Sequence, residues 1–252
     1  MYTDFALVYD RLMQDVDYQG WADHYAALLR MAGLNDGATV TECACGTGNL
    51  TLPLSARYRM TGLDLSQEML SQAALKLKQA GRQVPLICQD MQQLKVHRPQ
   101  DAILCTCDGI NYLTGFKGLS RFFGAAFLAL RPGGALAFDV SSLYKLSQVL
   151  GDKTLTSTKG DSHYIWYNCW QLQANLLHMQ LHVYTRAPDL RFDYFVEDQR
   201  QRAYTTDNLT QALLDAGFGQ IQVFGGLTFQ PPRDEEERLH LLAIKPTEKD
   251  TA

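Results

Sequence analysis

The sequence predicts an α/β protein built on a doubly wound, mostly parallel sheet of seven strands. Over the first two-thirds of its 252 residues, short apolar runs alternate with segments whose apolar residues recur at helical spacing. That pattern is typical of a parallel sheet covered by helices on both faces. After residue 150 the strand-like runs follow one another without helices, which predicts an antiparallel sheet inserted after the fifth strand. We expect one domain, 1–252, with the insert at 151–204 as a lid.

The first half of the chain supplies five strands. A helical N-terminal segment of about 30 residues precedes a strand at about 38–43, which runs into the turn Gly46-Thr47-Gly48 and a helix that begins near Asn49. Ser66 is a suitable N-cap for a helix that ends at Gly81. The remaining strands are expected at about 60–65, 84–88, 102–107 and 135–140, with a helix at about 119–130 and a tight turn at 131–134.

The second half departs from this rhythm. Strand-like runs separated by short polar turns indicate an antiparallel meander, at 163–170, 176–185 and 191–204. A helix follows, for which Thr205 or Thr206 is the expected N-cap and Gly217 the stop. The last two strands are expected at about 219–225 and 239–244.

Charge and composition exclude several function classes. With 46% apolar residues, 20% charged residues and a formal net charge of −4, the chain has no general attraction for the phosphates of nucleic acids. Its N-terminus has acidic residues where a secretion signal is basic, and no segment approaches the ~20 apolar residues that span a bilayer. We therefore expect a cytoplasmic protein without nucleic-acid or membrane partners.

The six cysteines are expected to be thiols, because disulfides are rare in a reducing compartment. Cys43 and Cys45 lie in one predicted strand and Cys105 and Cys107 in another, so four sulfur ligands could meet if the strands were neighbours. However, a Cys-x-Cys pair within an apolar strand lacks the usual spacing of zinc ligands, and free cysteines are commonly buried as small apolar residues. We expect no metal here.

A ligand site is predicted at the end of the first strand. The turn Gly46-Thr47-Gly48 joins a buried strand to a helix, so its backbone can approach a ligand and the helix N-terminus can bind a polar or anionic group. Glu42, Asp64 and Asp90 come near the ends of three successive strands. In a doubly wound sheet these ends line one crevice, where acidic side chains can hold the hydroxyls of a ribose and the amine of an adenine.

The residues around the turn discriminate between adenosine ligands. An ATP-binding loop requires a lysine after its last glycine, and no lysine follows Gly48. A loop that binds NAD or FAD usually has a third glycine, and this chain has Thr51 at that position. S-adenosylmethionine needs no pyrophosphate cradle, and its ammonium suits an acid such as Glu42. The sequence therefore favours S-adenosylmethionine. A nicotinamide-dependent oxidoreductase and a non-catalytic binding module are the alternatives.

Several motifs resemble those of the class I S-adenosylmethionine-dependent methyltransferases. At the respective spacings they are Glu42–Gly48, Gly62–Leu70, Gln89–Met91 and Leu130–Gly134. Ala44 stands where the pattern usually has glycine, and its small side chain still allows the turn. The opening segment Tyr2–Asp10 and the later Gln201–Tyr204 resemble a bacterial subgroup of small-molecule methyltransferases, akin in outline to the glycine and amino-sugar N-methyltransferases.

The resemblance implies a cofactor, a reaction and a set of binding residues. Glu42 and the loop would hold the methionine part of S-adenosylmethionine, and Asp64 would hold the ribose. The residues around the adenine would be Leu65, Met69, Asp90 and Met91. The cofactor-binding residues would be Tyr9, Glu42, Ala44, Cys45, Gly46, Gly48, Asp64, Leu65, Met69, Asp90, Met91 and Cys107. The methyl group would pass to a nitrogen or oxygen of a small-molecule acceptor.

The acceptor pocket is expected where the fourth strand ends and the inserted sheet folds over the cofactor. Methyl transfer is an in-line displacement at a carbon that the sulfonium already activates, so the protein chiefly aligns the reactants and excludes water. No catalytic residue is therefore assigned. The acceptor-binding candidates are Asn111, Tyr112, Trp166 and Arg202. We expect a monomer or a homodimer.

Overall fold

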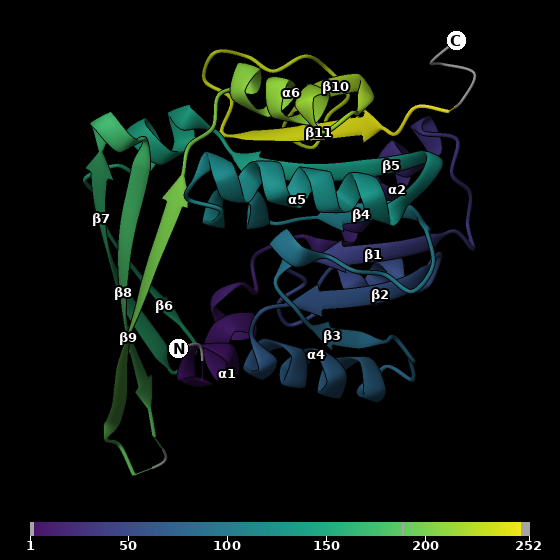
Figure 1. Cartoon of the computed structure of the whole chain (residues 1–252). Coiled ribbons are helices and arrows are strands. Elements are labelled where there is room, and N and C mark those ends of the chain that lie inside the picture. Colours follow the sequence, from purple (N-terminus) through teal and green to yellow (C-terminus); the bar gives the residue numbers. More distant parts are fainter. Residues whose placement is uncertain (1–2, 188, 248–252) are drawn as a thin grey trace.

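The computed structural model describes residues 3–187 and 189–247, and this part of the chain forms two sheets (Figure 1). The larger has seven strands in the order β10-β11-β5-β4-β1-β2-β3. Its strands are β1 (Thr39–Cys43), β2 (Arg59–Asp64), β3 (Leu86–Cys88), β4 (Gln100–Cys105), β5 (Leu130–Ser141), β10 (Gly219–Gly225) and β11 (Arg238–Ile244). β1 to β5 pair in parallel, whereas β11 is antiparallel to β5 and to β10. The predicted doubly wound, mostly parallel sheet is confirmed.

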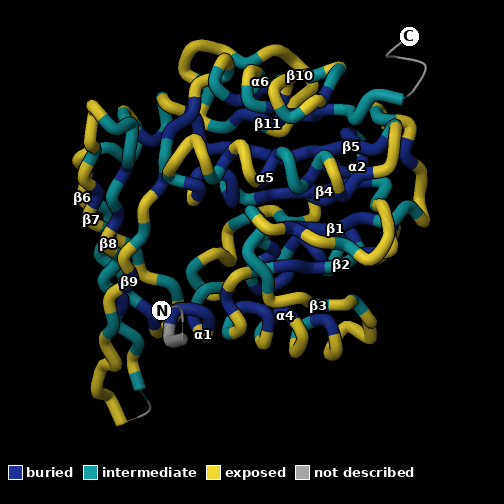
Figure 2. Tube along the Cα trace, in the orientation of Figure 1, coloured by how far each residue is buried: buried dark blue, intermediate teal, exposed yellow. Residues whose placement is uncertain are grey.

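Helices bury both faces of this sheet, because alternate residues of each strand point to opposite cores. On β5, Ala135 and Ala137 pack in the core that holds α2 (Tyr18–Met31). Leu136 and Phe138 pack in the core that holds α5 (Phe116–Ala129). Figure 2 shows the strands as the buried centre of the molecule. Burial on both faces explains why the central strands read as continuous apolar runs in the sequence.

The remaining helices begin where the sequence offers capping residues. They are α1 (Thr3–Leu12), α3 (Thr51–Leu54), α4 (Gln67–Gln79) and α6 (Thr206–Asp215). The Ser66 hydroxyl accepts a hydrogen bond from the Met69 amide at 3.2 Å, and Thr205 forms a capping box with Asn208. Both satisfy backbone donors that the first turn of a helix leaves unpaired. The predicted caps are confirmed, and Gly217 follows α6 with a positive φ of 100°.

The inserted sheet has one strand more than the sequence predicts. Its order is β6-β7-β8-β9, and the strands are β6 (Thr154–Lys159), β7 (Ser162–Gln171), β8 (Leu176–Arg186) and β9 (Phe192–Arg202). β6 is polar along its length and gave no apolar signal. In Figure 1 the sheet stands at one end of the α/β body beside α1. Its Val183 packs against Phe5 and Val8 of α1, so a core of its own joins the insert to the N-terminal helix.

Two further local predictions are confirmed with a detail that the sequence did not indicate, and a third was wrong. The N-terminal helical segment is divided into α1 and α2, because Asp17 caps α2 by accepting from the Gly20 amide at 2.9 Å. The helix after β1 has only four residues. The segment 131–134 is not a separate turn but lies within β5, where the register shifts between the pairs Gln100–Leu130 and Ala102–Ala135. Tyr2, part of the resemblance at the N-terminus, lies outside the described residues.

Thr205→Ala should destabilise the protein by about 1 kcal/mol, because it removes one half of the capping box of α6. Urea denaturation followed by circular dichroism measures the change. Ser71→Ala, on the exposed side of α4, is the matched control and should stay within about 0.5 kcal/mol of the wild type. Equal effects of the two substitutions would contradict the capping assignment.

Candidate active site

A cavity of about 390 Å³ lies at the carboxyl ends of the parallel strands. Its floor is made by residues at and after the ends of β1, β2, β3 and β4, and its cover by side chains of α1, of the turn after it and of the start of α2. The cover residues are Phe5, Tyr9, Met13, Val16, Tyr18 and Trp21. A volume of this size is in the range of small-molecule sites. The position agrees with the rule that ligands of open α/β sheets bind outside the carboxyl ends of the strands.

The loop after β1 is shaped by left-handed residues. Ala44, Gly46 and Gly48 have φ values of 53°, 54° and 74°, a region that glycine adopts freely and alanine at a cost of roughly 1–2 kcal/mol. A Cβ on Gly46 would meet nothing within 4 Å, so this glycine serves the turn. A Cβ on Gly48 would lie 3.2 Å from the Ala73 side chain. Gly48 therefore allows the loop to pack against α4 and does not line the cavity.

Glu42 places a buried carboxylate beside this loop. Its side chain is 1% exposed and accepts hydrogen bonds from the hydroxyls of Thr51 at 2.5 Å and Thr106 at 2.8 Å. Burial raises the pKa of Glu42 to about 7. A carboxylate that has lost water but gained only hydroxyl donors favours a cationic ligand, because an ammonium would stabilise its charged form.

Asp64 and Asp90 line the same cavity from the neighbouring strands. Asp64 accepts from the Gly46 amide at 2.7 Å and from the Ser66 amide at 2.9 Å, and burial raises its pKa. It therefore fastens the loop after β1 to the start of α4. Asp90 caps the short helix η1 (Met91–Gln93) by accepting from the Gln92 amide at 2.9 Å. The structure brings the three predicted carboxylates to one cavity.

Helix α1 is fastened over this cavity by Asp10. Its carboxylate accepts from the Thr47 hydroxyl at 2.6 Å and the Asn49 amide at 3.0 Å, and it pairs with Lys76 of α4 at 2.7 Å. Tyr9, on the same helix, lines the cavity. The N-terminal helix is thereby tied to the loop after β1 and to the helix after β2.

The turn after β4 carries a group of charged residues that sequence reasoning missed in part. Asp108 lines the cavity, as does Arg238 of β11. Arg238 pairs with Asp108 at 3.0 Å and also with the fully buried Asp139 of β5. Tyr25 donates to Asp139 at 2.9 Å. Asp139 is a lone acid within the apolar run of β5, and this was the one sequence signal that could have drawn attention to it.

Most of the predicted cofactor residues line the cavity. They are Tyr9, Glu42, Ala44, Cys45, Gly46, Asp64, Leu65, Met69, Asp90, Met91 and Cys107. Of the acceptor candidates Tyr112 does so, and its hydroxyl donates to Gln199 of β9 at 2.9 Å. Tyr18, Trp21, Gln199 and Arg238 also line it, and the sequence gave no signal for them, because none lies near the strand-end motifs.

Asn111, Trp166 and Arg202 lie outside the cavity lining. The amide of Asn111 is fully buried and donates to the carbonyls of Ser141 and Arg202. The Arg202 guanidinium lies 4.6 Å from the centre of the Phe116 ring. Trp166 packs against a small apolar core within the insert. The hydrogen bonds of the Asn111 side chain and of the Arg202 guanidinium join the inserted sheet to the α/β body, whereas Trp166 packs within the insert.

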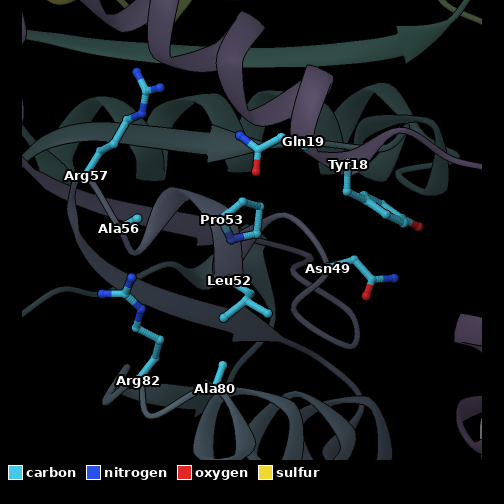
Figure 3. Close-up of a pocket in the computed structure, with 9 residues that line it drawn as sticks. All are labelled: Tyr18, Gln19, Asn49, Leu52, Pro53, Ala56, Arg57, Ala80 and Arg82. Carbon is cyan, nitrogen blue, oxygen red and sulfur yellow. The ribbon is translucent and has the colours of Figure 1, made fainter.

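A second, open groove adjoins the cavity (Figure 3). Tyr18 and Asn49 line both, and the groove continues between α2, α3 and the end of α4. Its charged lining consists of Arg57 and Arg82, and Arg57 is paired with Asp23 at 2.9 Å. Within its lining it lacks the carboxylates that line the deeper cavity.

The cysteines form no metal cluster in the part of the chain that the structure describes, where no group of three potential metal-ligating side chains converges. Cys43 and Cys105 are register partners on β1 and β4, and both are fully buried. Burial raises the pKa of the Cys43 and Cys105 thiols, so they remain neutral. Within the same described ranges, no helix has the length and apolarity required to cross a membrane.

Comparisons with known proteins identify the family. A family model described as a methyltransferase domain matches residues 40–134. The "Putative methyltransferase YqeM" of Bacillus subtilis (strain 168) is 32% identical over 249 residues, which cover 97% of each chain. A crystal structure of an S-adenosylmethionine-dependent methyltransferase from Clostridium acetobutylicum ATCC 824 is 31% identical over 98% of this chain and 99% of that chain, with a TM-score of 0.88. The chain belongs to the class I S-adenosylmethionine-dependent methyltransferases.

More distant methyltransferases share the fold over the whole length. CalS10, an amino pentose methyltransferase from Micromonospora echinaspora solved with S-adenosylmethionine bound, has a TM-score of 0.76 at 18% identity, over 97% of this chain and 98% of that chain. The predicted family, enzyme class and cofactor are confirmed. The comparisons therefore support neither of the two alternatives, a nicotinamide-dependent oxidoreductase or a binding module without turnover.

Glu42→Gln should stabilise the cofactor-free methyltransferase relative to wild type as the pH rises. The pKa of Glu42 is about 7 in the folded protein, against an ordinary 4.5, so the folded state binds this proton more tightly than the unfolded state. Its contribution is present below about pH 4.5 and is lost as the pH rises through about 7. Urea titrations at about pH 5 and pH 8 should show that the variant gains roughly 2–4 kcal/mol relative to wild type.

The exposed Glu235→Gln is the control for the Glu42 experiment, since that side chain lies in a solvent-facing loop. Its stability relative to wild type should change little between the two pH values. A stability difference between Glu42→Gln and wild type that does not change with pH would show that Glu42 is not a desolvated carboxylate.

Proposed function

We propose that this methyltransferase transfers the methyl group of S-adenosylmethionine to a nitrogen or oxygen of a small-molecule acceptor, with both reactants in the cavity at the carboxyl ends of the strands. The observation that carries the proposal is the meeting of Glu42, Asp64 and Asp90 around one cavity beside a loop of left-handed residues. An adenosine with a cationic amino-acid tail complements this arrangement in shape and in charge.

The donors and acceptors of the cavity match S-adenosylmethionine part by part. Glu42 would hold the ammonium, together with the backbone of Ala44, Cys45 and Gly46. Asp64 would accept hydrogen bonds from the ribose hydroxyls. It stands at the end of β2, and the bonds that it accepts from the Gly46 and Ser66 amides fix the orientation of its carboxylate. The residues around the adenine would be Leu65, Met69, Asp90 and Met91, with Tyr9 above the cavity and the Cys107 backbone near the methionine part. Gly48 would act indirectly, by seating the loop on α4.

The chain's own contribution to the reaction is alignment and exclusion of water. When bound, the cofactor supplies a methyl carbon that its sulfonium has already activated. Tyr9, Tyr18, Trp21 and Tyr112 would surround the reacting groups with aromatic surface, which leaves little room for water and holds the acceptor in line. An amine that arrives neutral needs no general base, so the absence of an assigned catalytic residue fits this chemistry.

The acceptor would enter on the β4 side of the cavity, under the inserted sheet. Tyr112 and Gln199 support this assignment, because they line the cavity and are hydrogen-bonded to each other across the boundary between body and insert. The insert at 151–204 would then act as the lid of a single domain. An amino sugar is the acceptor type named for the structurally similar CalS10, and the cavity's acidic lining favours a nitrogen acceptor of this kind.

The reaction is tested with radiolabelled S-adenosylmethionine and a panel of small amines, alcohols and carboxylic acids. We expect label in at least one small-molecule product that depends on both the protein and the acceptor. Label in protein or nucleic acid from a cell extract, with none in the small-molecule fraction, would contradict the proposed acceptor class.

Asp64→Ala should weaken binding of S-adenosylhomocysteine roughly 10- to 100-fold, because hydrogen bonds to a charged group contribute about 1.5–3 kcal/mol. Calorimetry measures the dissociation constant, and circular dichroism checks that the fold is retained. Asp36→Ala, in an exposed turn, is the matched control. Unchanged affinity in Asp64→Ala would refute the ribose assignment.

A further inference from the structure

The turn after β4 is held in a strained conformation. Cys107 and Asp108 are consecutive non-glycine residues with φ values of 53° and 56°. Each such residue costs on the order of 1–3 kcal/mol and persists only when its surroundings fix it. Here the Asp108 amide donates to the buried Asp139 carboxylate at 2.9 Å. The backbone of Asp108 is therefore fixed from β5.

The side chain of Asp108 is fixed as well. One carboxylate oxygen accepts from Arg238 at 3.0 Å, and the other accepts from the Gln201 amide of β9 at 2.8 Å. Although burial raises the pKa of Asp108, the charges of Arg238 and Lys145 and the hydrogen bonds from Gln201 and Arg238 together outweigh it and hold this pKa below its usual range. The carboxylate is therefore ionised at neutral pH. Three elements, β5, β9 and β11, converge to hold one charged group in one orientation.

This fixed carboxylate still faces the cavity. Asp108 is among the lining residues, and 22% of its side-chain surface remains exposed. Each carboxylate oxygen has two acceptor positions, so Arg238 and Gln201 leave room for a further donor. In the strand order β4-β1-β2-β3, Asp108 lies on the far side of β1 from Asp64 and Asp90. The carboxylates assigned to the adenosine and Asp108 thus stand at opposite ends of the site.

The polar groups at the acceptor end indicate what Asp108 would bind. Among the described residues, the cavity is lined by the carboxylates of Glu42, Asp64, Asp90 and Asp108 and by a single cation, Arg238. The cofactor engages the first three. At the acceptor end Arg238 is shared between Asp108 and the buried Asp139, and Lys145 is a further cation near Asp108, so Asp108 is the carboxylate that presents acceptor oxygens to the cavity there. A carboxylate or phosphate group has no donor for the Asp108 carboxylate, whereas a neutral primary or secondary amine can donate an N–H to Asp108 while its lone pair stays free.

We propose that Asp108 is the specificity-determining residue for the acceptor and that it selects a primary or secondary amine, with Gln201 as a positioning residue behind it. This inference rests on the proposed function, in which the acceptor enters on the β4 side. Asp108 accepts an N–H of the amine and turns the nitrogen lone pair toward the methyl carbon. Asp139 and Arg238 serve the same end by fixing the turn.

The chemical step balances without a protein base. The amine loses its extra proton to solvent before it reacts, because only the neutral nitrogen has a lone pair. That lone pair forms the bond to the methyl carbon as the carbon–sulfur bond breaks, and the two electrons of the broken bond go to sulfur. The nitrogen becomes a methylated cation beside Asp108, and it returns its surplus proton to solvent after release. The ionised Asp108 stabilises the charge that develops on nitrogen.

The test uses two cofactor analogues and needs no known acceptor. Sinefungin carries an amine-bearing carbon where S-adenosylmethionine has its methylated sulfur, and S-adenosylhomocysteine carries nothing there. Calorimetry on the full-length protein gives both dissociation constants. We expect the wild type to bind sinefungin at least tenfold more tightly than S-adenosylhomocysteine. A wild-type ratio near one would overturn the inference.

Asp108→Asn should bring the ratio of the two affinities to within about threefold of one, while the dissociation constant of S-adenosylhomocysteine stays within threefold of wild type. That second value also shows that the variant is folded. Gln201→Met, which keeps the volume but removes the donor to Asp108, should lower the ratio three- to tenfold. Asp198→Asn is the control on the same strand, since Asp198 is exposed and pairs with His178, and it should leave the ratio unchanged.

The outcomes separate this inference from the proposed function. If Asp108→Asn binds S-adenosylhomocysteine normally but keeps the wild-type ratio, Asp108 does not act at the acceptor end and the inference is wrong. If Asp108→Asn fails to fold, Gln201→Met decides in its place, and an unchanged ratio there overturns the positioning role. If the wild type binds neither analogue, the proposed cofactor site itself is wrong.

Discussion

The site depends on one constraint: carboxylates are placed at the edge of a parallel sheet where water is scarce. Parallel strands end at the same edge, so acids that are far apart in the chain meet there. Burial raises the pKa of Glu42, and the hydrogen bonds from the hydroxyls of Thr51 and Thr106 offset this only in part. The Asp64 carboxylate holds the loop after β1 by accepting a hydrogen bond from the Gly46 amide. The cofactor-free protein thus keeps negative charge in a desolvated place, and a cationic ligand relieves that cost.

The second carboxylate group differs because it is already neutralised in part. Asp108 and Asp139 share Arg238, and the shared guanidinium comes from β11, which pairs antiparallel with β5. The antiparallel strand β11 therefore does more than extend the sheet. It delivers a cation to the carboxyl edge from the opposite chain direction, next to the ends of β4 and β5.

Much of the fold was predictable because its signals are local. The alternating apolar runs gave the central strands, and Ser66 and Thr205 gave helix starts that the structure confirms. β6 was missed because its residues are polar and its pairing with β7 is a long-range property. The segment Arg131–Gly134 resembles a tight turn in sequence, yet it lies within β5 as an irregular stretch between the pairs that Leu130 and Ala135 form with β4, and the backbones of Gly133 and Gly134 are hydrogen-bonded to that of Lys245.

Most of the cavity lining near β1, β2 and β3 was also predictable, because strand-end acids and a glycine turn are read from sequence spacing. Of the four acceptor candidates, Tyr112 alone lines the cavity. Asn111 and Arg202 are polar residues near strand ends, but their side chains donate hydrogen bonds to backbone carbonyls, which join the insert to the body. Arg238 and Gln199 reach the cavity from segments more than 90 residues away from the motifs around Asp108, and only the three-dimensional structure brings them there.

A crystal structure with S-adenosylhomocysteine bound tests the central claim most directly. The account predicts the adenosine across the carboxyl ends of β1 and β2, with the ribose hydroxyls on Asp64 and the ammonium near Glu42. A ligand seated in the outer groove of Figure 3, with these carboxylates untouched, would contradict it.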